Sequence, residues 1–158
     1  MARPAPPYSR AVPTSDATSA ASSAVAALVH AYAERLDAGD LDGVAELFAG
    51  ATWRSDRGTE RRGTADVRLA YDPVILYDGS PRTRHVISNL VVEVTAAAAT
   101  SRCYFSVMQA PPGHDLQIIL AGRYHDRFEL ESGQWRFVER YIGIDLLGDL
   151  RWHMRFEQ

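Results

Sequence analysis

The sequence predicts one α+β domain, in which N-terminal helices pack on one face of a curved, mainly antiparallel sheet. Two observations predict this class. Apolar residues recur at helical spacing only in the first half of the chain, whereas the second half consists of segments rich in β-branched and aromatic residues, separated by turn residues. The length of 158 residues suits a single domain with one hydrophobic core.

About three helices are expected before the sheet. Apolar residues at helical spacing between Val25 and Leu36 predict a first helix over about residues 22–38. Gly39 suits the C-terminal end of this helix, and Asp40 can cap a second one. The apolar face of the second helix consists of Leu41, Val44, Leu47 and Phe48.

A short strand is expected around residues 51–54, followed by a polar loop over residues 55–63. Thr64 can cap a third helix, which Asp72 and Pro73 should interrupt because the residue before a proline avoids helical backbone angles. Four strands of an antiparallel meander are then predicted, over residues 85–94, 100–110, 116–130 and 135–144.

The domain itself is placed at residues 21–145, and the two ends of the chain differ from it. Residues 1–20 are rich in Pro, Ser, Ala and Thr, which predicts a disordered leader. Residues 146–158 carry Trp152, Met154 and Phe156, so this C-terminal tail is expected to pack at a subunit contact.

Composition argues against several classes of function. The net charge is −3 and no segment carries a basic stripe, so nucleic acid is not expected as a partner. No apolar run has membrane-spanning length, and no secretory signal precedes the domain, which predicts a cytoplasmic protein without a membrane partner. The single cysteine, Cys103, excludes an internal disulfide.

The chain also contains no lysine, which excludes Schiff-base chemistry and a covalently held pyridoxal group. Motifs for a metal site, a phosphate loop, a dinucleotide or a serine nucleophile are absent from the sequence. We therefore expect no metal and no cofactor. Any catalysis must use ordinary side chains on a bound organic molecule.

The longest predicted strand presents one face that is apolar apart from Tyr124 and Asp126. The residues of this face are Leu116, Ile118, Leu120, Gly122, Tyr124, Asp126 and Phe128. A buried carboxylate needs a partner, and Arg140 on the next strand is an equally isolated charge. Two interpretations stay open: a structural pair of Asp126 with Arg140 across adjacent strands, or Arg140 in a pocket wall, where it binds a substrate oxygen.

His85 begins the first strand of the meander, and Asp37 ends the first helix. An acid at a helix C-terminus opposes the helix dipole and therefore calls for a reason. An aspartate that is hydrogen-bonded to a histidine fixes its tautomer and raises its basicity, as a proton-abstracting base requires. Four large side chains belong in the core or on the wall of a pocket within it: Tyr32, Trp53, Tyr104 and Met108.

Several blocks of the sequence resemble the SnoaL-like members of the nuclear transport factor two-like superfamily. The matching blocks occur in order, at residues 31–42, 45–48, 83–89, 121–128 and 133–137. The resemblance implies a cystatin-like α+β cone that encloses an apolar pocket. This superfamily holds lyases, isomerases, cyclases, hydrolases and non-catalytic proteins, so fold alone does not give the reaction.

The motifs are most similar to those of scytalone dehydratase and lindane dehydrochlorinase, which use an Asp–His dyad. The resemblance implies that Asp37 orients His85 and that His85 takes a proton from carbon, in an elimination or an isomerisation. It also implies a homo-oligomer, either a trimer or a dimer. A small, largely apolar organic metabolite is the expected substrate, and the residues expected to bind it are Tyr32, Trp53, Asn89, Tyr104, Met108, Tyr124, Asp126 and Arg140.

Two alternatives remain open at this point. The chain could be a non-catalytic ligand-binding or structural subunit of the same fold, like the small subunit of ring-hydroxylating dioxygenases. It could also be an epoxide hydrolase or an epoxide-opening cyclase, in which Asp126 and Arg140 act around a water. The sequence departs from scytalone dehydratase at Leu36, where that enzyme has a tyrosine, and at Gly122 and Tyr124, which replace its Ser and Asn.

Overall fold

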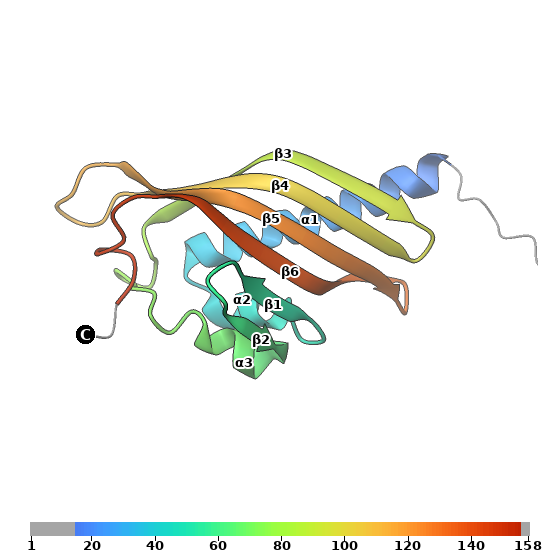
Figure 1. The fold of residues 1–158 in the computed structure, drawn as a ribbon, viewed down its shortest axis with the longest axis horizontal. Helices are drawn as coiled ribbons and strands as arrows, with labels where there is room; N and C mark the ends of the chain where they lie inside the picture. The colour runs from blue at the N-terminus through green and yellow to red at the C-terminus, as the bar shows by residue number, and fades with distance from the viewer. Residues whose placement is uncertain (1–14, 156–158) are drawn as a thin grey trace, which may run out of the picture.

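Three helices pack on a six-stranded mixed sheet in the computed structural model, which describes residues 15–155 (Figure 1). The helices are α1 (Ser15–Ala38), α2 (Leu41–Glu46) and α3 (Gly63–Leu69). The strands are β1 (Thr52–Ser55), β2 (Glu60–Arg62), β3 (Thr83–Thr95), β4 (Ala98–Gln109), β5 (Gln117–Glu131) and β6 (Gln134–Leu147), in the order β2-β1-β6-β5-β4-β3. The predicted α+β class, with helices ahead of a mainly antiparallel sheet, is confirmed.

The hydrophobic core lies between α1 and the inner face of the long strands, while α2, α3, β1 and β2 gather beside β6 (Figure 1). Each long strand contributes every second residue to this face, as alternation requires. The most deeply buried members of the core include Val25, Val29, Val44, Phe48, Val107, Ile119, Tyr124 and Phe128.

Helix α1 is longer than predicted, since it begins at Ser15 instead of near residue 22. The segment 15–20, expected to belong to a disordered leader, is helical, and residues 1–14 of that leader lie outside the described residues. Alanines favour a helix in this segment, and Asp16 suits the positive N-terminal end of the helix. A segment without an apolar stripe can still extend a helix that later turns hold in the core.

The junction between α1 and α2 follows the sequence closely. Asp40 caps α2, where its side chain accepts a hydrogen bond of 2.9 Å from the backbone N–H of Gly43. Helix α3 differs from the prediction that Thr64 caps it, because Arg62 occupies the N-cap without a side-chain cap bond. The carboxylate of Asp66 instead accepts from the backbone N–H of Arg62 at 2.9 Å.

The antiparallel meander is formed by β3 to β6, as predicted, but two short strands extend the sheet. The segment 55–63, predicted as a loop, contains β2, which pairs with β1. Strand β1 in turn pairs in parallel with β6, with Thr52 opposite Glu139. Strands of three or four residues are too short to show a period, and their partner lies far along the chain, so sequence patterns do not detect this pairing.

A bulge in β5 changes which residues face the core. The register between β4 and β5 shifts after Val107, which leaves Ile119 as the extra residue. Ile119 is fully buried as a result, whereas Leu116 and Ile118, expected on the inner face, are exposed. Beyond the bulge, the predicted face from Leu120 onward is correct.

The C-terminal tail packs on its own chain. Within the tail, Met154 forms an isolated bridge with Val74, and the backbone N–H of Gly148 donates to the carbonyl of Ile119 at 2.8 Å. The predicted contact with another subunit stays a prediction, because these interactions are made within one protomer. None of the helices within residues 15–155 is both long and apolar enough to cross a membrane.

Candidate active site

A cavity of about 400 Å³ opens between α1, α3, the β1–β2 hairpin and the inner face of the sheet. Its volume suits a small organic molecule. Most of the side chains around it are apolar or aromatic, and they include Tyr32, Leu36, Trp53, Tyr71, Val74, His85, Phe105, Val107, Leu120, Tyr124, Ile142, Ile144, His153 and Met154. The prediction placed Tyr32, Trp53, Tyr124 and His85 in such a pocket, and all four line this cavity.

Asp37 and His85 meet at one wall of the cavity. Asp37 is buried on the last turn of α1, and His85 lies near the start of β3. The Nδ1 atom of His85 lies 2.6 Å from Oδ1 of Asp37, and the backbone N–H of His85 donates to Oδ2 at 2.8 Å. The hydroxyl of Thr83 donates to Oδ1 at 2.8 Å. Nε2 is thus the ring nitrogen of His85 that remains for a bound molecule.

The surroundings of Asp37 determine its charge. Burial raises the pKa of Asp37, but the hydrogen bonds and charge of His85 and the hydroxyl of Thr83 together bring the pKa below its ordinary value. An ionised carboxylate can only accept hydrogen bonds, so the proton of a neutral His85 ring belongs on Nδ1. Nε2 then carries a lone pair, which is the state of a general base.

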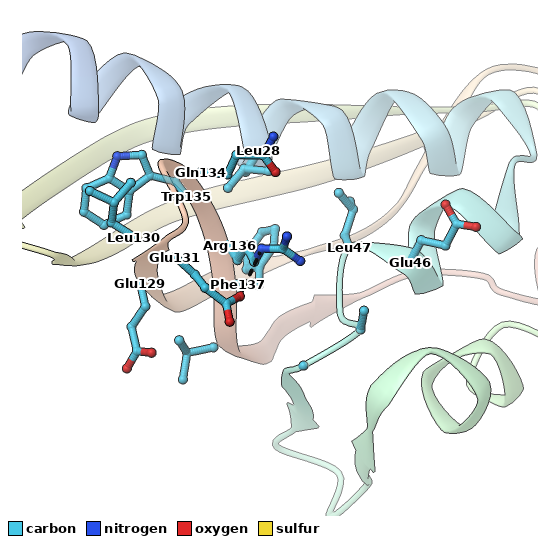
Figure 2. Close-up of a pocket in the computed structure, with 13 residues that line it drawn as sticks. Leu28, Glu46, Leu47, Glu129, Leu130, Glu131, Gln134, Trp135, Arg136 and Phe137 are labelled. Atoms are coloured by element: carbon cyan, nitrogen blue, oxygen red, sulfur yellow. Dashed lines mark ion pairs between the residues drawn. The ribbon is translucent and has the colours of Figure 1, made fainter.

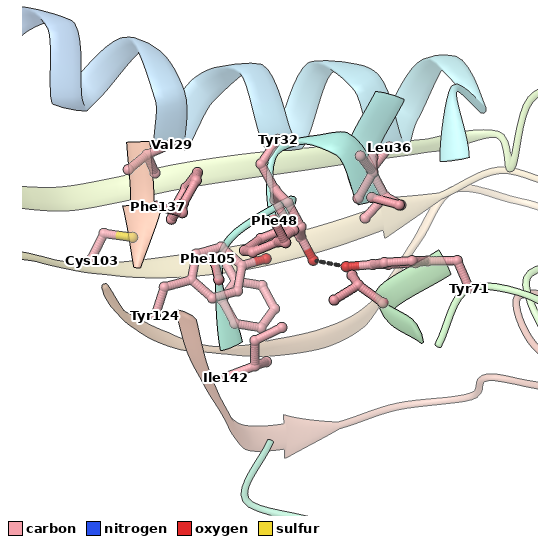
Figure 3. Close-up of a cluster of buried hydrophobic side chains, with 14 of the residues drawn as sticks. Val29, Tyr32, Leu36, Phe48, Tyr71, Cys103, Phe105, Tyr124, Phe137 and Ile142 are labelled. Carbon is pink, nitrogen blue, oxygen red and sulfur yellow. Dashed lines mark hydrogen bonds between the residues drawn. The ribbon is translucent and has the colours of Figure 1, made fainter. Parts of the chain in front are cut away.

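A second wall carries a hydrogen-bonded chain of three aromatic side chains. The hydroxyl oxygens of Tyr32 and Tyr71 lie 2.9 Å apart (Figure 3), and Nε1 of Trp53 donates to the hydroxyl of Tyr71 at 3.1 Å. The two tyrosines have one hydroxyl proton each, and one of these makes the bond between them. The indole cannot accept the other proton, because it only donates, so that proton remains for an oxygen of a bound molecule. Burial raises the pKa of Tyr71 well above its ordinary value, so its hydroxyl stays protonated.

Asp126 and Arg140 form a buried pair behind the cavity. They are register partners on β5 and β6, and Nε and Nη2 of Arg140 donate to the two carboxylate oxygens at 2.8 and 2.7 Å. The guanidinium stacks on the rings of Tyr32 and Tyr124, at 4.2 and 4.1 Å from the ring centroids. Both charged side chains are 0% exposed. The structure therefore has the structural pair, and neither side chain lines the cavity.

Three other residues predicted to bind the substrate point away from the cavity. Tyr104 is 57% exposed, and Met108 shares its face of β4, because Phe105 and Val107 take the inward positions. Asn89 is exposed at the irregular middle of β3, with φ of +53°. The alternation of β4 was assigned to the wrong face, and a strand pattern as weak as this one does not distinguish the two faces.

Polar residues of the cavity that were not predicted as site residues are Tyr71, His153 and four residues of the β1–β2 hairpin: Ser55, Arg57, Thr59 and Arg61. Tyr71 follows α3 directly, and His153 lies in the C-terminal tail. Each stands alone in an irregular segment, so periodicity gives no information on where its side chain lies. The only available signal was the aromatic and apolar content of the tail, which indicated that the tail docks on some surface.

A second hollow of about 490 Å³ lies between α1, α2 and the β5–β6 hairpin (Figure 2). Leu28, Leu47 and Phe137 contribute apolar surface to it, and Glu131 pairs there with Arg136 at 3.2 Å. Neither Asp37 nor His85 lines this hollow. Within residues 15–155, no three His, Cys, Asp or Glu side chains lie close enough together to hold a metal ion. The cavity beside His85 is therefore the candidate active site.

Comparison with known proteins identifies a family and solved structures that are similar to this chain. Residues 17–141 match the family described as the SnoaL-like domain. No curated protein matches the chain significantly. An aspartate-to-asparagine variant of Rv3472, a protein of unknown function from Mycobacterium tuberculosis, is 28% identical, with 84% of this chain and 76% of that chain covered and a TM-score of 0.71.

Two further solved structures share the fold at lower identity. A protein named as a candidate scytalone dehydratase from Novosphingobium aromaticivorans is 18% identical, with 84% of this chain and 89% of that chain covered and a TM-score of 0.69. An NTF2-like protein with a cystatin-like fold from the same organism is 19% identical, with 77% and 80% covered and a TM-score of 0.65. These structures confirm the predicted cystatin-like α+β cone.

Proposed function

The chain belongs to the SnoaL-like domain family, and from that premise we propose that it is a cofactor-free lyase or isomerase acting on a small, largely apolar organic molecule. The observation that carries the proposal is the buried contact between Asp37 and His85 at the wall of an apolar cavity. A histidine that an ionised carboxylate holds against a cavity is arranged as a general base with its orienting group.

His85 would take the proton. The lone pair on Nε2 accepts a proton from a carbon of the substrate, and the electron pair of the broken C–H bond forms a new double bond or an enolate. Asp37 stabilises the imidazolium that results, since its carboxylate accepts the Nδ1 hydrogen. General-base action of this kind contributes about 10²–10⁴-fold to the rate.

The aromatic wall suits the oxygen on which negative charge develops. The free phenol proton of the Tyr32–Tyr71 pair can donate to that oxygen. Arg140 lies behind Tyr32, and although burial lowers its pKa, the carboxylate of Asp126 raises it above the ordinary value overall. The cation is thus permanent and favours an anionic oxygen without contacting it.

The two alternative functions have less support. An epoxide-opening reaction through Asp126 and Arg140 requires a water between them, yet the two side chains bind each other directly and neither is exposed. A purely ligand-binding protein would use the same cavity but has no need of a histidine held by an ionised aspartate. The experiment that follows separates binding from catalysis.

Proton abstraction can be tested without the natural substrate. The protein is incubated in D₂O with small cyclic ketones, and deuterium incorporation beside the carbonyl is followed by NMR. We expect the wild type to accelerate the exchange and His85→Gln to lower the rate by roughly 10²–10⁴-fold. His125→Gln, which changes an exposed histidine of β5, should exchange like the wild type. Equal rates for His85→Gln and the wild type would exclude His85 as the base.

A further inference from the structure

His153 is a second histidine of the same cavity, and the mechanism above gives it no role. Its residue is 7% exposed, and it lines the cavity together with His85. The Nδ1 atom of His153 is buried without a hydrogen-bond partner among residues 15–155. A buried imidazole nitrogen without a partner is unfavourable, so hydrogen bonds within the described residues do not explain why this polar ring lies at the wall of an apolar cavity.

The tail segment around His153 is fixed by hydrogen bonds on both sides. The backbone N–H of Ile75 donates to the carbonyl of His153 at 2.9 Å. The backbone N–H of Arg155 donates to the carbonyl of Pro73 at 2.8 Å. The amide of Gln109 donates to the carbonyl of the residue before His153 at 3.1 Å. These bonds thus hold the tail in the cavity wall, where the polar side chain of His153 lies among apolar ones.

The imidazole of His153 is neutral at ordinary pH. Burial and the neighbouring His85 lower its pKa to about 4, while Asp37 acts in the opposite direction. Two charged residues of its own segment, Asp149 and Arg151, pair with each other at 2.7 Å. A neutral imidazole offers one N–H donor and one acceptor nitrogen.

We propose that His153 is a substrate-binding residue whose neutral imidazole donates a hydrogen bond to a carbonyl oxygen, while His85 takes a proton from the neighbouring carbon. The inference rests on the proposed function and narrows its substrate class to small apolar ketones or enones. Two imidazoles that reach one apolar cavity from β3 and from the tail supply the base and the donor that enolisation requires.

The step balances without another reactant. The C–H bond breaks, its proton binds Nε2 of His85, and the electron pair forms a carbon–carbon double bond as the carbonyl electrons move to oxygen. His153 keeps its proton and hydrogen-bonds more strongly to the oxygen as the negative charge grows. In an enone the enolate is a conjugated dienolate, and the proton returns from His85 to the far end of it, which moves the carbon–carbon double bond. In a saturated ketone the proton returns to the carbon it left. A neutral imidazole is a weak acid, so this arrangement favours isomerisation over expulsion of a hydroxyl group.

The contact can be tested with 1-tetralone labelled with ¹³C at the carbonyl, used at millimolar concentration. Two measurements are made: the ¹³C shift of the bound carbonyl and the rate of deuteration at C2. His153→Phe keeps a ring of similar size without a donor, and His153→Leu is a second replacement should that ring not fit. His153→Gln retains an N–H donor. His30→Phe is the matched control, because it makes the same change at an exposed histidine of α1 that lies outside the cavity.

We expect the wild type to shift the carbonyl signal downfield and His153→Phe or His153→Leu to reduce that shift and slow deuteration by about 100-fold, while the phenol proton of the Tyr32–Tyr71 pair accounts for the shift that remains. His153→Gln should retain part of both effects, and His30→Phe should resemble the wild type. A wild-type shift and rate in both His153→Phe and His153→Leu overturns the inference, as does the absence of any bound signal with the wild type.

The same data separate this inference from the proposed function. His85→Gln should lose deuteration but keep the shifted carbonyl signal, because it retains His153. If His153→Phe and His153→Leu reduce the wild-type shift, yet neither the wild type nor any variant exchanges C2, the proposed catalysis is wrong and the His153 contact stands. If His85→Gln loses exchange while His153→Phe and His153→Leu lose nothing, the base stands and the His153 contact is wrong.

Discussion

Asp37 owes its position to residues that are distant in the sequence. Its carboxylate lies at the negative end of α1, where the helix dipole disfavours it, and three donors from Thr83 and His85 compensate. Because one of those donors is the ring of His85, the same contacts that keep Asp37 ionised also fix the direction of the imidazole. In the proposed mechanism Asp37 is a positioning residue, since His85 lines the cavity and Asp37 does not.

Asp37→Asn tests that positioning role. The amide keeps the shape of the side chain but loses the charge, and its NH₂ group can favour the tautomer of His85 that carries the proton on Nε2. We expect deuterium exchange to fall by roughly 10²–10⁴-fold and the ¹⁵N shifts of His85 to report the changed tautomer. Thr83→Val removes a neutral donor to the same carboxylate and should cost much less. Equal losses in the two variants would contradict the role of the charge.

His153 should also make the stability of the protein depend on pH. Its folded pKa of about 4 lies below the ordinary value of 6.5, so the unfolded chain takes up the proton first as the pH falls. The free energy of unfolding should therefore decrease between pH 6.5 and pH 4, by about 2 kcal/mol from pH 7 to pH 5 for this group alone. Urea unfolding at the two pH values measures the difference.

The replacement His153→Phe should remove that part of the pH dependence, whereas His114→Phe, at an exposed histidine, should leave it unchanged. If wild type and His153→Phe lose the same free energy between pH 7 and pH 5, the ring of His153 is not buried in its neutral form.

At the scale of elements, the sequence predicted what is long and periodic. The strands β3 to β6 and the cap at Asp40 follow from alternation and from local capping chemistry. The parallel pairing of β1 with β6 does not follow, because four residues are too few to show a period. The partner also lies 87 residues away, as Thr52 opposite Glu139 shows. The bulge at Ile119 likewise leaves no signal, since one extra residue reverses the faces of whatever precedes it.

The same limit applies to the candidate site. Asp37 and His85 were placed by the resemblance and meet in the structure, although their catalytic role stays a prediction. Tyr71 and His153 belong to irregular segments, whose side-chain directions depend on contacts made only in the folded chain. The Asp126–Arg140 pair was left with two interpretations because a strand pattern shows that two charges face inward but not whether a ligand lies between them.

The turn after α1 is an element on which the site depends. Gly39 has φ of +79°, and a Cβ atom there would collide with the carbonyl oxygen of Gly79. Gly58 has φ of +83° in open space, so Gly58→Ala carries the backbone strain without the collision. We expect Gly58→Ala to cost about 1 kcal/mol of stability and Gly39→Ala to cost about 2–3 kcal/mol, measured by urea unfolding. Equal losses of stability in the two variants would show that residues 79–80 move away from the added Cβ atom at no cost.

The whole molecule presents two different faces of one sheet. The inner face carries the core and the cavity, whereas the outer face of β3 to β6 exposes a row of apolar side chains. Val86 and Leu146 lie in one cross-strand row, and Ile118 pairs with Met108 in the next. Val86, Ile118 and Leu146 are exposed in the protomer. We propose that a second copy of the chain covers this outer face in a homo-oligomer, because burying exposed apolar side chains such as these favours association.

Ile118→Glu is the variant that tests the assembly, because Ile118 is 65% exposed and a charge there leaves the fold of the protomer intact. If the outer face is covered by another copy, the variant buries an unpaired carboxylate at the contact, which costs about 2 kcal/mol or more and weakens association at least ~30-fold. Light scattering should then give a dimer or a trimer for the wild type and a smaller mass for Ile118→Glu at the same concentration.

His30→Glu adds the same charge to the exposed side of α1 and should keep the wild-type mass. A monomeric wild type across the accessible concentrations would refute the assembly while leaving the cavity, which one protomer forms by itself, unaffected.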